Sequence, residues 1–208
     1  MAMNIIKSNN FSADDITFSE VKPFGTNGGK QVYLNYKNNQ IRMQSPKMRL
    51  PYGMGKYEEN GKPTKYSLDF SFSGIDDNEK ISDFHKAVKE IDEKIIAETT
   101  KKYSLQWFKK KKMSEEVART IFTPSIKRSK DKETGEFDDK YPPTFKAKMP
   151  VYEDNFACSV FDHKKNKIEN DSIENSIKKG QSASAIIKCA GVWFSGGKYG
   201  VSWKVDQL

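Results

Sequence analysis

The chain has 208 residues, of which 36% are apolar, 31% charged and 12% aromatic, and it carries a formal net charge of +8 with a pI near 9.2. This length supports a hydrophobic core, and aromatic residues spread along it argue against a disordered chain. The charge excess favours a polyanionic partner, and no stretch has the length and apolar character of a signal peptide or a membrane span.

The first third of the chain alternates between apolar and polar residues as β-strands do. A segment at 46–63 carries three prolines and three glycines, which predicts a long loop. The expected strands cover 16–22, 30–36, 41–45 and 65–73, with turns at 24–29 and 37–40.

In the hairpin formed by 30–36 and 41–45, the alternation separates a core face from an outer face. Tyr33 and Arg42 are expected on the outer face. The side chains expected to face the core are Val32, Leu34, Tyr36, Ile41 and Met43.

The middle of the chain, about 76–143, is predicted to be a helical and charged insertion. Asn78 and the two aspartates before it offer a helix cap, and apolar residues then recur at spacings of three and four over 79–100. This stripe is typical of a helix packed on a sheet. Ser114 begins a shorter second helix, and 127–143 is expected to be a mobile loop or an extended hairpin.

The last third returns to β-structure. Residues 144–149, 155–161 and 184–190 are candidate strands, and the isoleucines within 164–180 allow a short helix. The closing stretch GVWFSGGKYGVSWKV predicts a hairpin with a two-residue turn at Gly196-Gly197. Its predicted core face holds Val192, Phe194, Tyr199, Val201 and Trp203.

The other face of that hairpin places Trp193 opposite Gly200, with Lys198 and Lys204 nearby. An aromatic ring beside cations suits single-stranded nucleic acid, because bases stack on the ring while the cations neutralise phosphates. Three further places combine the same residue types. The candidate binding residues are Tyr33 and Arg42; Lys47, Arg49 and Tyr52; Trp107, Lys109 and Lys110; and Trp193 and Lys198.

Each candidate also has a purely structural interpretation. Trp193 could shield a glycine or pack under another element, and Tyr33 could be an ordinary surface tyrosine. The 46–57 segment could cover the core with its methionines and Leu50. A lysine run such as 109–112 is usually a solvated face.

The residue types that catalysis and metal binding require are sparse. Cys158, Cys189, His85 and His163 show no zinc-site spacing, and reduced thiols are the simplest interpretation of the cysteines. No nucleophile elbow, HExxH or Walker motif is present. Paired aspartates at 76–77 and 138–139 are more typical of caps and solubilising charge than of a nuclease. We therefore expect no enzyme, no metal and no cofactor.

The segment NGGKQVYLNYKNNQIRMQSPKMRLPYGMG with KYSLDFSF, and the closing GVWFSGGKYGVSWKVDQL, resemble single-stranded-DNA-binding proteins of nucleocytoplasmic large DNA viruses. The closing hairpin is also similar, more loosely, to phage replication proteins that bind single strands. The resemblance implies an OB-like β-barrel and the protection or organisation of single strands in viral replication, recombination or repair. It implies an intracellular site, in the host cytoplasm or the nucleus.

These observations predict a mainly β, OB-like barrel over 1–208, with one long amphipathic helix, a short second helix and no catalytic activity. The expected ligand is single-stranded DNA, with RNA as an open possibility because no feature is aimed at a 2′-hydroxyl. An alternative is a protein-interaction module of a replication or transcription assembly, in which the helix at 79–100 meets protein partners. A nuclease is the third hypothesis.

Overall fold

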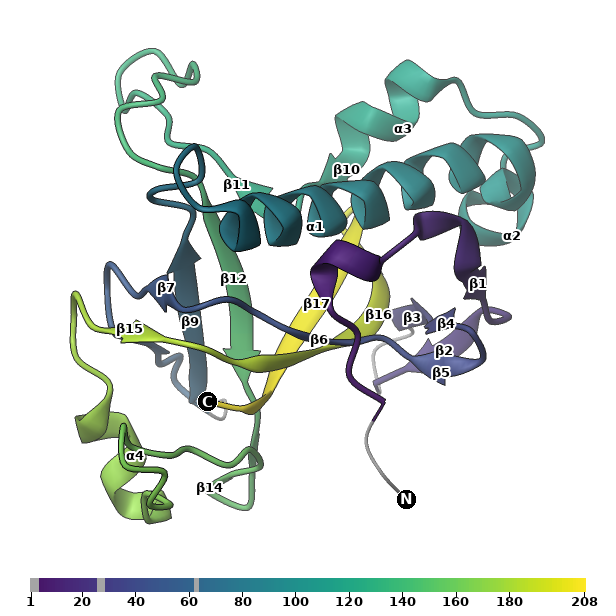
Figure 1. Ribbon diagram of the computed structural model, residues 1–208. Helices are drawn as coiled ribbons and strands as arrows, with labels where there is room; N and C mark the ends of the chain where they lie inside the picture. Colours follow the sequence, from purple (N-terminus) through teal and green to yellow (C-terminus); the bar gives the residue numbers. More distant parts are fainter. Residues whose placement is uncertain (1–3, 26–28, 62–63) are drawn as a thin grey trace.

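The structure is a computed structural model that describes residues 4–25, 29–61 and 64–208 (Figure 1). Its short helices before the first strand are η1 (Ser8–Asn10) and η2 (Ala13–Asp15). The strands of the described residues are β1 (Ile16–Phe18), β2 (Lys22–Phe24), β3 (Gly29–Val32), β4 (Leu34–Tyr36), β5 (Asn39–Gln40), β6 (Arg42–Gln44), β7 (Met48–Arg49), β8 (Met54–Tyr57), β9 (Lys65–Ser71), β10 (Phe122–Thr123), β11 (Ile126–Lys127), β12 (Thr144–Met149), β13 (Val151–Tyr152), β14 (Asn155–Phe156), β15 (Ser182–Ala183), β16 (Ile186–Ser195) and β17 (Lys198–Gln207).

Within the described ranges, twelve of these strands form one sheet. Eight of them follow the order β15-β7-β9-β12-β17-β16-β3-β2. In addition, β8 pairs with β9, β10 with β17, β11 with β12 and β6 with β16. Two small sheets, β1-β4-β5 and β13-β14, complete the β-structure. This mainly β architecture with one long helix and shorter helices confirms the predicted fold class. It is consistent with an OB-like fold that carries helical insertions.

The β16–β17 hairpin is the longest strand pair and has the predicted two-residue turn, with Ser195 opposite Lys198. Phe194 lies opposite Tyr199 and Trp193 opposite Gly200, as the turn predicts. An irregularity between Cys189 and Gly191 shifts the register further along. Gly191 has a φ of +120°, and a Cβ there would lie 2.7 Å from the Val32 carbonyl oxygen, so only glycine fits this bulge.

The long helix α1 (Glu79–Glu98) crosses one end of the large sheet (Figure 1). Asn78 caps it by accepting hydrogen bonds from the backbone N–H groups of Lys80 and Ile81, as predicted. Its buried stripe meets the sheet through Phe84, whose ring lies 5.5 Å from that of Phe145 and 6.0 Å from that of Phe72. No helix of the described residues combines the length and the apolar character that a membrane crossing requires.

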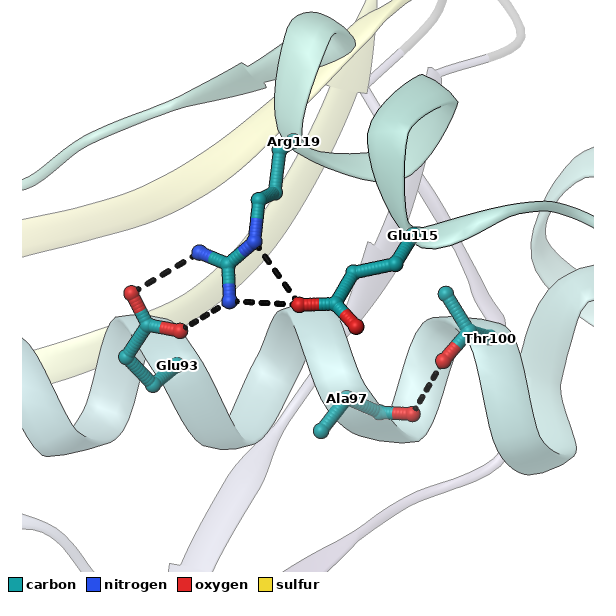
Figure 2. A network of polar contacts seen from close by, with 5 residues as sticks. All are labelled: Glu93, Ala97, Thr100, Glu115 and Arg119. Atoms are coloured by element: carbon teal, nitrogen blue, oxygen red, sulfur yellow. Dashed lines mark hydrogen bonds and ion pairs between the residues drawn. The ribbon is translucent and has the colours of Figure 1, made fainter.

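Two shorter helices follow α1. A π-helical turn at Thr99–Tyr103 leads into α2 (Ser104–Phe108), and Ser114 caps α3 (Glu115–Ile121) as predicted. Figure 2 shows how α3 is fixed to α1: Arg119 donates to both carboxylate oxygens of Glu93, at 2.9 and 2.6 Å, and to Glu115. This bidentate pair lowers the pKa of Glu93 and aligns the two helices.

Several elements differ from the sequence predictions. The 46–63 loop contains β7 and β8, which form because β9 and β15 supply backbone partners. The predicted strand at 155–161 is reduced to β14, and the short helix within 164–180 is α4 (Asn170–Ser176). Of the predicted turn at 24–29, residues 26–28 lie outside the described residues, as do 62–63 of the loop.

A buried polar network joins α1 to the sheet. Asp92 is 6% exposed and accepts hydrogen bonds from the backbone N–H and the hydroxyl of Ser125, at 2.7 and 2.8 Å. The indole N–H of Trp203 in turn donates to the Ser125 hydroxyl at 3.0 Å. Burial raises the pKa of Asp92 to about 7, and the two Ser125 hydrogen bonds oppose that rise.

This raised pKa predicts a pH-dependent stability. The folded protein holds the Asp92 proton more tightly than the unfolded chain, so the stabilisation is fully present below about pH 4 and is lost as pH rises through about 7. We expect Asp92→Asn to remove this loss, because an amide is neutral throughout. Urea unfolding of both proteins between pH 4 and pH 8 is the measurement. A stability difference between them that stays constant across this range would contradict the assignment.

Candidate nucleic-acid interface

The outer face of the large sheet carries a row of cations in register across neighbouring strands. Lys148 of β12 lies opposite Lys204 of β17, which lies opposite Lys188 of β16, which lies opposite Arg42 of β6. Each alternates along its strand with buried residues, so all point away from the core. Neighbouring strands are about 4.8 Å apart, so these four residues, the cationic row, span about 14 Å.

Two residues of the cationic row share one carboxylate within the protein. Asp206 accepts a hydrogen bond from Arg42 Nε at 2.8 Å and forms an ion pair with Lys188. Within the described part of the chain, Lys148 and Lys204 form no ion pair. The four cations therefore share one carboxylate, and a net charge of +3 remains on the row.

Lys148 lies at one end of the row, opposite Lys204. Although its side chain reaches solvent, partial burial lowers the pKa of its amine, and the neighbouring charges of Lys204 and Lys65 lower it further. Like charges repel one another, so an anion bound among them would relieve the repulsion. The charge distribution at this point therefore fits a bound polyanion.

Trp193 lies on the same outer face, opposite a residue of β17 that is four positions from Lys204, or about 13 Å along the strand. Its cross-strand partner is Gly200, and a Cβ at that glycine would lie 3.0 Å from Trp193 Cζ2 and 2.8 Å from the Thr123 carbonyl oxygen. The indole ring therefore covers Gly200, which is buried, while Trp193 itself stays partly exposed. Trp193 thus shields a glycine, as its structural interpretation expects, and its role as a stacking platform stays a prediction.

Tyr33 and Lys198 extend this surface. Tyr33 is 39% exposed, and Lys22 Nζ lies 5.5 Å from the centre of its ring. Lys198 is exposed at the end of the hairpin and shares its face with Trp193. The structure thus brings four predicted residues to one face: Tyr33, Arg42, Trp193 and Lys198.

A second predicted group lies further along the chain from Arg42. Lys47, Arg49 and Tyr52 are exposed and belong to the segment around β7, which continues from β6 and pairs with β15 as β6 pairs with β16. The same segment covers the core with Met48 and Leu50, as its structural interpretation requires. Whether these three residues contact a ligand stays a prediction.

The interpretation of Trp107 as an accessible platform is wrong. Trp107 is 2% exposed and packs in an aromatic cluster, stacked on Tyr103 at 4.9 Å with Phe18 and Phe194 at its edges. The π-helical turn before α2 directs this ring inward. Lys109 and Lys110 remain exposed beyond the end of α2.

Sequence reasoning missed Lys148 and Lys188, and it named Lys204 only as a neighbour of Trp193. Their signal was the strict alternation of strands such as TFKAKM, where lysines lie between core residues. For metal chemistry, the described residues bring together no group of three His, Cys, Asp or Glu side chains that could hold an ion.

The sequence matches a family model and a viral protein. A model described as "Family of unknown function (DUF5871)" matches residues 73–208. An uncharacterized protein of Acanthamoeba polyphaga mimivirus is 28% identical over 177 residues, which cover 83% of this chain and 26% of that protein. The chain thus spans about a quarter of this relative's length. This relative is a viral protein, as the resemblance to viral proteins in the sequence analysis led us to expect.

Solved structures similar to this chain include single-stranded DNA-binding proteins from bacteriophage Enc34. The one in complex with single-stranded DNA has a TM-score of 0.49 and 16% identity, and the match covers 88% of this chain and 90% of that one. A second structure of the phage protein has a TM-score of 0.46 and 16% identity, over 91% and 88% of the two chains.

Proposed function

The chain belongs to the family of unknown function DUF5871, and we propose that it binds single-stranded DNA on the outer face of its sheet without catalysing a reaction. The observation that carries the proposal is the cationic row, which shares its face of the sheet with Trp193. We place this activity in the replication, recombination or repair of viral DNA inside the host cell, a setting that the viral relative supports.

The chemistry of this face matches that of a single strand. The cationic row offers contacts to successive phosphates, and Lys148 and Lys204 gain the counter-charges that they lack. Trp193 and Tyr33 offer ring surface to unpaired bases. In a duplex the base faces are stacked on one another, and the cationic row lies on strands rather than on a helix shaped for a major groove.

Fluorescence anisotropy with a labelled oligonucleotide tests the proposal. We expect single strands to bind more tightly than duplex of the same length, with little sequence bias. Four to six phosphate contacts predict a log–log salt slope of about −3 to −4. Competition by duplex as strong as by the single strand, or a slope near zero, would contradict the proposal. An RNA competitor of the same sequence measures the preference between DNA and RNA.

Trp193→Ala tests the stacking part separately. We expect it to weaken binding of the single strand by about 1–3 kcal/mol, the usual contribution of one stacked base. Because the ring is only partly buried, the melting temperature should change little. If the variant melts much earlier while its folded fraction binds normally, the ring serves only to cover Gly200.

A further inference from the structure

A cavity of about 700 Å³ opens between α1, the end of α3 and the segment that runs from β10 to Pro143. In Figure 1 this segment rises from β11 as the loop beside the first turns of α1. We call this cavity the hairpin groove. Its lining consists of apolar walls and a basic rim. The walls are Ile96, Phe122, Pro124, Ile126, Phe137 and Pro143.

The hairpin that forms one side of the groove has a defined conformation. Lys130 bridges to Phe137 across it, and Arg128 pairs with Asp139. At its tip, Asp131 Oδ1 accepts hydrogen bonds from the backbone N–H groups of Glu133 and Thr134, at 2.9 and 2.8 Å. These contacts hold the side chain of Phe137 at the groove although it is 55% exposed.

The rim of the groove carries more positive than negative charge, because five cations of the lining face two acids. Within the described ranges, the exposed residues Lys89, Lys127 and Lys130 form no ion pair. The acidic groups of the lining are already engaged: Glu93 pairs with Arg119, and Asp92 is buried against Ser125. A ligand in the groove therefore meets cations at its edge and aliphatic carbon on its walls.

We propose that the hairpin groove binds an acidic segment of a partner protein through an apolar anchor side chain. Charge complementarity selects the acidic residues, and the proline and isoleucine walls suit a Leu or Phe anchor. Nucleic acid fits less well, because bases stack on free aromatic faces. The ring of Phe137 already has Arg128 at 4.5 Å and Lys130 at 4.8 Å from its centre.

Labelled peptides of about a dozen residues test the proposal with the full chain. The probe is a Glu/Asp/Gly peptide with a central Leu-Phe pair, and its analogues replace the acids by glutamine or the Leu-Phe pair by serine. We expect saturable binding of the probe and at least about tenfold weaker binding of both analogues. Lys89→Glu with Lys127→Glu should weaken the probe about tenfold or more, and Phe137→Ser should do the same while the net charge of the rim stays the same.

The matched control is Lys86→Glu with Lys164→Glu, two exposed lysines outside the groove. It should leave peptide binding unchanged, as should Lys148→Glu in the cationic row. The proposal is overturned if the neutral analogue binds as well as the acidic probe, or if no peptide of the panel saturates. It is also overturned if the groove variants weaken an oligonucleotide and spare the peptide.

Discussion

Replacing Lys148 by glutamate is expected to weaken binding of a single-stranded oligonucleotide by about 10- to 100-fold, because a hydrogen bond to a charged group contributes about 1.5–3 kcal/mol. The introduced carboxylate would also pair with Lys204 and Lys65, whose charges now lower the pKa of Lys148. The variant's own carboxylate therefore competes with phosphate for those two lysines. Anisotropy titrations at fixed salt measure the effect.

The same substitution should not harm the fold. The repulsion among Lys148, Lys204 and Lys65 is replaced by attraction, so the free energy of unfolding should stay equal or rise by up to about 1 kcal/mol. Lys86→Glu makes the same change of charge at an exposed position of α1 and is the control. Equal losses of affinity in the two variants would mean that net charge alone drives binding.

Local patterns predicted the faces of the strands, and the reason is geometric. In a strand the side-chain period is two, so alternation alone assigns Val32 and Met43 to the core and Arg42 to the surface. In the closing hairpin the two-residue turn also fixes the partners, and it placed Trp193 opposite Gly200. The sequence therefore located the Trp193 end of the candidate interface.

Pairings between distant segments were beyond such reasoning. Lys148 and Lys204 lie opposite each other because β12 and β17 pair in parallel. Alternation within a strand shows which way a side chain points, but it does not show which strand lies beside it. The cationic row exists only once β12, β17, β16 and β6 are assembled. This is why the sequence offered separate patches where the structure has one face.

Trp107 shows a second limit. A Trp-Phe pair followed by four lysines is expected at the surface, since the lysine run is strongly polar. The π-helical turn at Thr99–Tyr103 changes the phase of the helix, and tertiary packing with Phe18 and Phe194 then decides the burial of the ring. Such a change of helix type is set by the surroundings of the helix, so periodicity within the sequence does not predict it.

Trp203→Ala is expected to lower the free energy of unfolding by about 3–5 kcal/mol, the largest effect on stability among these predictions. The ring is fully enclosed and packs at 5.5 Å against Phe145, and its N–H donates to Ser125 within the network that ends at Asp92. Truncation removes the ring, leaves a cavity beneath α1 and takes the indole donor from that network.

Urea unfolding of three variants separates these contributions. Trp203→Phe keeps a ring and loses the hydrogen bond, so it should cost less than Trp203→Ala, with about 1 kcal/mol from the hydrogen bond itself. Trp193→Ala, on the opposite face of the same hairpin, should cost much less than Trp203→Ala because Trp193 is partly exposed. Equal losses at Trp193 and Trp203 would show that both rings are core residues, and the outer face would then lose its stacking platform.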